Sequence, residues 1–176
     1  MIDFEEPSAV SYADIASVPA ETSLLGGLLL DNGHWDRIGD MLVVSDFSRL
    51  AHQLIFGAAA ALIDASKPAD VITVFEELRR HGSADAAGGV EYLHSLTQYV
   101  PSASNIRKYA ETVRELALRR TLIAAGGEII EIAKNRKATF DETLEAATSK
   151  VTALFDSRGS QDDWQEAQQG MQVLVD

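Results

Sequence analysis

The chain has 176 residues, of which 46% are apolar and 24% charged, and its 15 Lys and Arg stand against 27 Asp and Glu for a net charge of −12. This composition is typical of one folded domain with its own core. The lack of cysteine excludes disulfides, thiolate metal sites and cysteine catalysis. No apolar run reaches the roughly 18 residues of a membrane helix, and the acidic start lacks the features of a signal peptide. We therefore expect a cytoplasmic protein that does not contact membranes.

The charge is distributed unevenly along the chain. Residues 1–102 carry 5 Lys and Arg against 15 Asp and Glu, whereas residues 103–157 carry 9 against 8. The second block is therefore nearly neutral, and it is the part of the chain least repelled by another copy of itself. A chain this acidic also lacks the basic surface by which proteins bind DNA or RNA.

The N-terminal part predicts a disordered arm followed by a helix. Residues 1–18 are polar and acidic, which predicts an arm without fixed structure. Pro19 suits the first turn of a helix, and the leucines of residues 24–29 recur at helical spacing, so we expect a helix over residues 20–30. Gly26 and Gly27 cost this helix about 2 kcal/mol in propensity. They predict that another helix packs close against it.

Residues 31–102 continue as short helices. A helix over 48–66, which Ser45 or Asp46 would cap, is apolar on two faces and is therefore expected to be central, with His52 as a hydrogen-bonded core histidine. Asp70 is a good N-cap and Gly82 a good C-terminal residue for the next helix. No segment alternates with the period of a strand. Residues 19–102 therefore predict an all-α globular head.

Residues 103–157 predict an antiparallel helical hairpin that projects from the head. One apolar stripe runs from Ile106 to Ile130, and Thr139 with Glu142 forms a capping box for a second helix. In the second helix, apolar residues from Phe140 to Leu154 follow a heptad pattern. Each helix has a face for its partner in the hairpin, and any remaining apolar face needs a second surface. We expect a dimer whose contact buries Ile123, Ile130, Leu144 and Val151.

Residues 158–176 predict a polar linker and the start of a linker helix. Trp164, Met171 and Leu174 recur at helical spacing. Because so short an amphipathic helix is not stable alone, these three side chains are expected to dock on another surface.

The sequence carries no recognisable catalytic or metal-binding motif. It contains no phosphate-binding GxxxxGK[ST] loop, no GxGxxG, no GxSxG and no HExxH. No two of its four histidines share the spacing of metal ligands on one helix. We therefore expect no catalytic, cofactor-binding or metal-binding residue in this chain, and the residues by themselves indicate a helical interaction module.

Several ordered motifs resemble the N-terminal domain of DnaB-type bacterial replicative helicases. The resemblance covers about residues 18–157, and the motifs that carry it are Ala20-Glu21-Thr22-Ser23-Leu24-Leu25-Gly26-Gly27, Pro68-Ala69-Asp70-Val71-Ile72-Thr73 and Pro101-Ser102-Ala103-Ser104-Asn105-Ile106 with Tyr109-Ala110. The resemblance implies a head, a hairpin and a linker helix followed by a RecA-like motor domain. It implies six copies in a ring, with the N-terminal domains paired through their hairpins as three dimers that form a collar.

The same resemblance implies partners. Primase would bind the collar, and the linker helix would dock on the motor domain of a neighbouring subunit. ATP, Mg²⁺ and DNA would be bound only by the motor domain, whose residues this chain lacks. The preferred hypothesis is a non-catalytic collar domain, in a piece cut within the linker helix of an ATP-dependent DNA helicase. Two alternatives remain open: a standalone collar-like protein that regulates or loads a helicase, and a small helical enzyme outside this family.

Overall fold

The computed structural model describes residues 15–98, 100 and 105–156. In these residues the secondary structure is entirely helical, which confirms the all-α prediction. The α-helices are α1 (Val18–Leu30), α2 (Trp35–Ile38), α3 (Leu50–Asp64), α4 (Val71–Arg80), α5 (Gly89–Gln98), α6 (Ile106–Lys134) and α7 (Phe140–Asp156). Two short 3₁₀ helices, η2 (Asn32–His34) and η3 (Val44–Asp46), join them.

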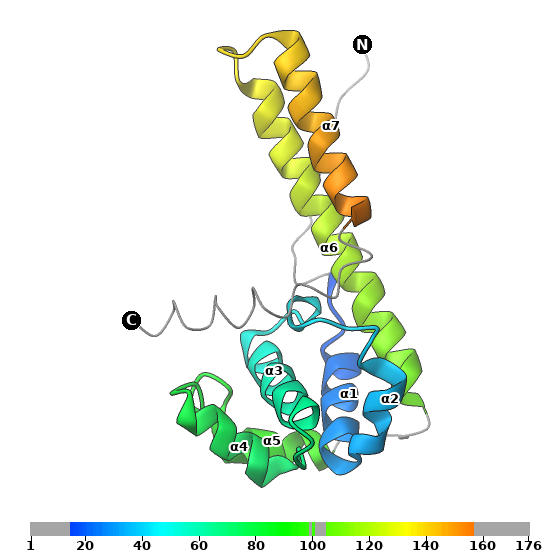
Figure 1. The fold of residues 1–176 in the computed structure, drawn as a ribbon, viewed down its shortest axis with the longest axis vertical. Coiled ribbons are helices and arrows are strands. Elements are labelled where there is room, and N and C mark those ends of the chain that lie inside the picture. The colour runs from blue at the N-terminus through cyan, green and yellow to red at the C-terminus, as the bar shows by residue number, and fades with distance from the viewer. Residues whose placement is uncertain (1–14, 99, 101–104, 157–176) are drawn as a thin grey trace, which may run out of the picture.

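The first five α-helices form the head, and α6 and α7 form the hairpin. Helix α6 packs along the head with its first half and then rises away from it, and α7 folds back beside its outer half (Figure 1). The core of the head is apolar, and its largest fully buried side chains include Phe47, Phe56, Leu24, Leu25, Leu28, Leu93 and Leu96. The predicted order of head and projecting hairpin is therefore observed.

Local sequence signals fix several of the helix ends. The Asp70 carboxylate accepts the backbone N–H groups of Ile72 and Thr73 at 2.9 Å, which caps α4 as predicted. Gly82 follows α4 with a φ of +69°, the left-handed conformation that glycine adopts without strain. The predicted capping box is also present, because Thr139 N–H donates to the Glu142 carboxylate at 2.7 Å.

One predicted cap is wrong. Helix α3 begins at Leu50 with Arg49 as its N-cap, so neither Ser45 nor Asp46 caps it. Asp46 instead ends η3, where its carboxylate accepts the Val43 N–H at 2.9 Å and faces α6. The N-terminal helix also begins at Val18 rather than after Pro19, because the Ser17 side chain caps it.

The glycine pair in α1 allows a close helix contact, as predicted. A Cβ on Gly26 would lie 2.2 Å from the carbonyl oxygen of Leu96 in α5, a distance that no side chain tolerates. A Cβ on Gly27 would lie 3.1 Å from the Ile106 side chain at the start of α6. The pair therefore brings α5 and α6 against α1 and so positions the base of the hairpin.

Candidate interaction surface on the helical hairpin

The hairpin buries very little of itself. In the half of α6 that lies beyond the head, Ala125 is the one buried residue, at 7% exposure. Among residues 140–154 of α7 none is buried; Ala147 and Leu154 are only half-buried. An ion pair between Lys150 of α7 and Glu128 of α6 crosses the two helices at their surface. Two helices in contact along one narrow line cannot build a core, so the outer hairpin keeps most of its apolar surface in water.

Six large apolar side chains are exposed on the hairpin. They are Leu122 (63%), Ile123 (38%), Ile130 (55%), Phe140 (78%), Leu144 (55%) and Val151 (42%). We call these six residues the hairpin apolar surface. The four residues that the sequence nominates for a dimer contact are all among them. In the single chain, between 38% and 55% of each of these four side chains is exposed. Burial against a second copy stays a prediction.

The sequence did not nominate two of these six residues. Leu122 is not part of the apolar stripe of α6. Phe140 belongs to the heptad stripe of α7 but is not among the four residues predicted for the dimer contact. The environment of the stripe changes along α6. Ile106 and Val113 are buried, with exposed fractions of 1% and 2%, whereas Ile123 and Ile130 are exposed. The change occurs where α6 leaves the head. Large exposed apolar residues that gather on one element make it a candidate surface for contact with another protein.

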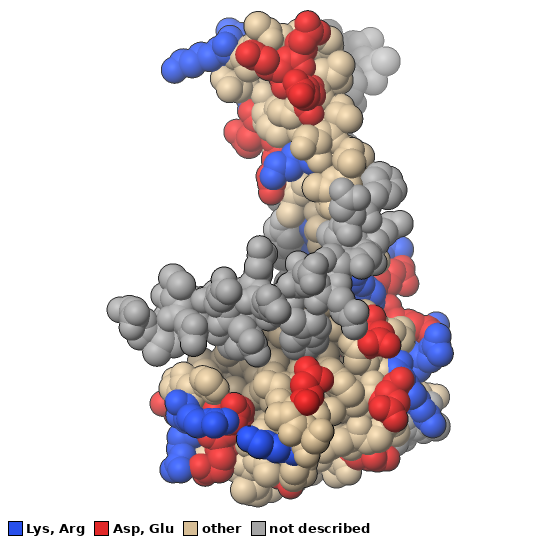
Figure 2. Space-filling view, in the orientation of Figure 1, with Lys and Arg blue, Asp and Glu red and all other residues tan. Residues whose placement is uncertain are grey.

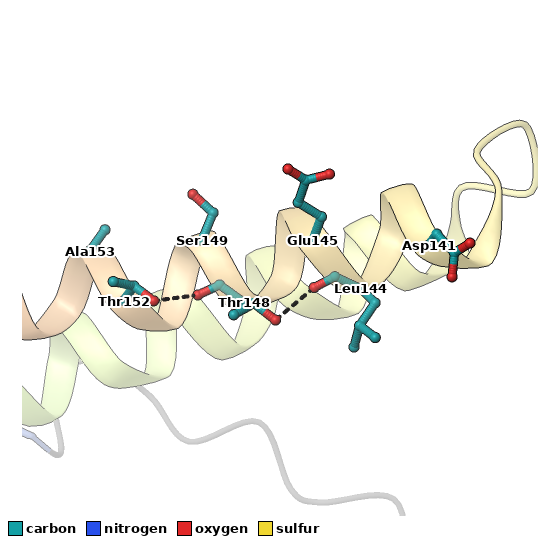
Figure 3. Close-up of a pocket in the computed structure, with 7 residues that line it drawn as sticks. All are labelled: Asp141, Leu144, Glu145, Thr148, Ser149, Thr152 and Ala153. Atoms are coloured by element: carbon teal, nitrogen blue, oxygen red, sulfur yellow. Dashed lines mark hydrogen bonds between the residues drawn. The ribbon is translucent and has the colours of Figure 1, made fainter.

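A shallow, open groove follows the outer face of α7. It is lined by Asp141, Leu144, Glu145, Thr148, Ser149, Thr152 and Ala153 (Figure 3). The hydroxyl of Thr148 donates to the carbonyl of Leu144, and that of Thr152 donates to the carbonyl of Thr148. These hydroxyls are thus already hydrogen-bonded to the helix. The groove is open along its length, unlike the enclosed pockets that bind small molecules.

His52 belongs to the core of the head. It is fully buried, with Nδ1 2.6 Å from the Glu21 carboxylate and Nε2 2.6 Å from the Tyr92 hydroxyl. Glu21 also accepts the Ser48 N–H at 2.9 Å. Burial raises the pKa of Glu21, but the hydrogen bonds from His52 and Ser48 outweigh it and hold that pKa below the usual 4.5. The prediction of a hydrogen-bonded core histidine is confirmed.

A polar cluster joins the head to α6. Arg114 Nη1 donates to the Asp46 carboxylate at 2.7 Å, and Arg120 donates to the carbonyl oxygens of Asp46 at 2.5 Å and Ile15 at 2.8 Å. Asp46 is only 3% exposed. This burial raises its pKa, although the Val43 N–H and Arg114 partly offset the effect. We call Asp46, Arg114 and Arg120 the junction cluster.

The described part of the chain offers no metal-binding or membrane-spanning feature. No three His, Asp or Glu side chains gather there in a way that could hold a metal ion. No helix in the same residues is both long and apolar enough to cross a bilayer. On the face shown in Figure 2, basic and acidic side chains intermingle over the head without a broad positive patch. Trp164, Met171 and Leu174, which the sequence nominates for docking of a linker helix, lie outside the described residues.

Comparison with known proteins gives a consistent result. Residues 13–115 match the family model of the DnaB-like helicase N terminal domain. The replicative DNA helicase DnaB of Pasteurella multocida is 38% identical to this chain over 143 residues, and that of Leifsonia xyli is 35% identical over 162 residues. These matches cover 81% and 89% of this chain but only 31% and 34% of the two helicases. The chain thus spans about a third of the length of these curated relatives.

Solved structures agree with the family match. The N-terminal domain of DnaB helicase from Mycobacterium tuberculosis superposes with a TM-score of 0.74 at 34% identity, covering 79% of this chain and 97% of that one. A DnaB-like replicative helicase, described together with its interactions with primase, superposes with a TM-score of 0.64 at 20% identity, covering 89% of this chain and 35% of that one. The second likeness concerns the fold alone. With its helical head, its projecting hairpin and its ordered sequence motifs, this chain belongs to the family of DnaB-like helicase N-terminal domains.

Proposed function

We propose that this chain is a non-catalytic collar domain of a replicative DNA helicase, in which the hairpins of two copies pair. The observation that carries the proposal is the hairpin apolar surface: six large apolar side chains lie exposed on the hairpin, whose part beyond the head buries one described residue, Ala125. A second copy offers the same surface in return, and a twofold contact is the commonest way in which a protein pairs with itself. The near-neutral charge of residues 103–157 keeps the repulsion between two such hairpins small.

The collar would serve as a platform for primase. The family match supports this role, and a DnaB-like helicase of the same fold is described with its interactions with primase. In the complete helicase, three such dimers would form the collar of a ring of six subunits. Trp164, Met171 and Leu174 would dock on a neighbouring motor domain. ATP, Mg²⁺ and DNA would be handled by motor domains rather than by the residues described above.

The pairing of hairpins is tested with one substitution at two matched positions. Ile130 on α6 is 55% exposed and Ile72 on α4 of the head is 57% exposed, so Ile130→Asp and Ile72→Asp remove similar surface from the single chain. Burying an unpaired carboxylate costs several kcal/mol, and a twofold contact contains the substitution twice. We expect light scattering to show a dimer for the wild type and Ile72→Asp, and a folded monomer for Ile130→Asp. A wild-type chain that stays monomeric at high concentration would contradict the proposal.

The primase role has its own measurement. Isothermal titration of the wild-type chain with the primase of the same organism should give saturable binding. Loss of primase binding in Ile72→Asp would place the primase site on the head. Loss of binding in Ile130→Asp would show that the site requires paired hairpins. If primase gives no heat and no co-migration at tens of micromolar while the dimer is intact, the platform role is refuted and the pairing role stands.

A further inference from the structure

The direction in which the hairpin leaves the head is determined where the first half of α6 packs on the head. Helix α6 is continuous over 29 residues, but its burial against the head ends near Ala117, which is 5% exposed. Beyond that point the helix extends freely to its partner α7 (Figure 1). In the head, α6 packs mainly on α1 and also contacts η3 and α2. Packing of this kind restricts the crossing angle of two helices but leaves a scatter of about 15–20°, within which directional contacts can select one tilt.

The junction cluster supplies directional contacts from a second element. Arg114 and Arg120 lie near the end of the packed segment of α6, and both donate to η3, through the carboxylate and the backbone carbonyl of Asp46. Arg120 also donates to Ile15, ahead of α1, so its guanidinium joins two separate segments of the head. Charge-assisted hydrogen bonds of this kind have defined geometry. We propose that Asp46, Arg114 and Arg120 set the angle between the hairpin and the head.

The energetics of Asp46 agree with a positional role. Asp46 is nearly inaccessible, and burial of its charge is costly enough to raise its pKa despite two nearby arginines. Replacing a buried ion pair by apolar groups is often neutral for stability, so such a pair is weak as a stabilising device but can enforce one geometry. The loop that carries Asp46 is itself anchored, because Ser48 N–H donates to Glu21 in the core. The head therefore presents Asp46 from a rigid position.

Because of the position of the junction cluster, a small change in the tilt of α6 there moves the far end of the hairpin by several ångströms. Residues 121–134 extend α6 by about 21 Å beyond Arg120, at about 1.5 Å per residue. A tilt of about 10° at the cluster would therefore move the far end of the helix by about 4 Å. This inference does not depend on pairing between copies. Where hairpins pair, the same angle determines how far apart the two heads lie.

Distances between spin labels within one chain test the proposal. The chain has no cysteine, so His94→Cys on α5 and Ala133→Cys near the end of α6, both exposed, accept labels specifically. Labelled chains are mixed with an excess of unlabelled chains so that only distances within a chain are recorded. We expect one narrow distance distribution for the otherwise unchanged chain. With Asp46→Asn and Arg120→Gln together, we expect it to shift or broaden by about 4 Å or more.

Arg119→Gln is the matched control. Arg119 neighbours Arg120 on α6 but forms an exposed ion pair with Glu115 on the same helix, so Arg119→Gln removes the same charge as Arg120→Gln alone but breaks a pair within α6 instead of a contact with the head. We expect it to leave the distribution unchanged, and Arg120→Lys, which keeps the charge, to give an intermediate width. Circular dichroism verifies folding, and if the double variant unfolds, Asp46→Asn and Arg120→Lys are decisive on their own. An unchanged distribution in the folded variants, or equal broadening by Arg119→Gln, overturns the proposal.

Discussion

Substitution of Glu21 measures how much the buried polar network stabilises the head. Glu21 is 1% exposed and its two oxygens serve different partners, the Ser48 N–H at 2.9 Å and His52 Nδ1 at 2.6 Å. An ionised carboxylate only accepts hydrogen bonds, so His52 Nδ1 carries a hydrogen here. Glu21→Met has a similar shape but no acceptor. It leaves two buried donors without partners.

The expected loss is large in relation to the stability of a domain. Each unsatisfied buried donor costs about 1–3 kcal/mol, and breaking a buried charged pair costs about 3–5 kcal/mol. We therefore expect Glu21→Met to lower the free energy of unfolding by about 3–5 kcal/mol, against a typical total of about 5–15 kcal/mol. Glu21→Gln should cost only about 1 kcal/mol. Its amide can still accept from Ser48 and donate to His52, whose Nε2 then donates to Tyr92.

Urea unfolding followed by circular dichroism measures these differences. Glu91→Met is the control, because Glu91 is exposed on α5 and its loss should cost less than about 0.5 kcal/mol. The folded pKa of Glu21 lies below the usual 4.5, so ionised Glu21 stabilises the head above pH 4.5, and this contribution is lost as the pH falls through the lowered pKa. Glu21→Gln should remove that part of the pH dependence. If Glu21→Met costs no more than Glu91→Met, the network does not stabilise the head.

The remaining predictions concern other parts of the chain. Gly26→Ala should be strongly destabilising, because its Cβ would collide with the Leu96 carbonyl. Gly126→Ala in α6 places its Cβ within 4 Å of nothing and should raise the stability by about 1 kcal/mol. Thermal unfolding of both variants in the Ile130→Asp background measures these effects without a contribution from pairing. Asn32→Ala should cost about 2–4 kcal/mol in urea unfolding, because the Asn32 side chain bonds both the N–H and the carbonyl of buried Ala69; a loss below about 0.5 kcal/mol would contradict this. With single-stranded DNA and ATP, phosphate release should stay at background, and fluorescence anisotropy at physiological salt should give no dissociation constant below about 10⁻⁶ M, because a net charge of −12 displaces few counterions. Turnover that follows the protein peak would refute the non-catalytic role.

Local signals in the sequence determined the helix ends that depend on near neighbours. Asp70, Gly82 and the pair Thr139 and Glu142 act within three or four residues, so their chemistry is readable without a fold. The same local rule failed at Asp46, which suits an N-cap. Its partner Arg114 is 68 positions away and lies against it only because α6 packs on the head. Its other partner, the Val43 N–H, is local but belongs to η3 rather than to α3.

Periodicity determined which residues are apolar along each helix, but not what they face. The stripe on α6 predicted an amphipathic helix throughout, yet Val113 is buried and Ile130 exposed because the head ends between them. Likewise, the sequence identified His52 as a core residue, but only the fold brought it to Glu21 and Tyr92, 31 and 40 positions away. Composition and spacing thus determined the all-α class, the hairpin and the apolar character of its outer half. The tertiary structure decided which of those side chains the chain itself covers, because burial depends on where other helices end in space.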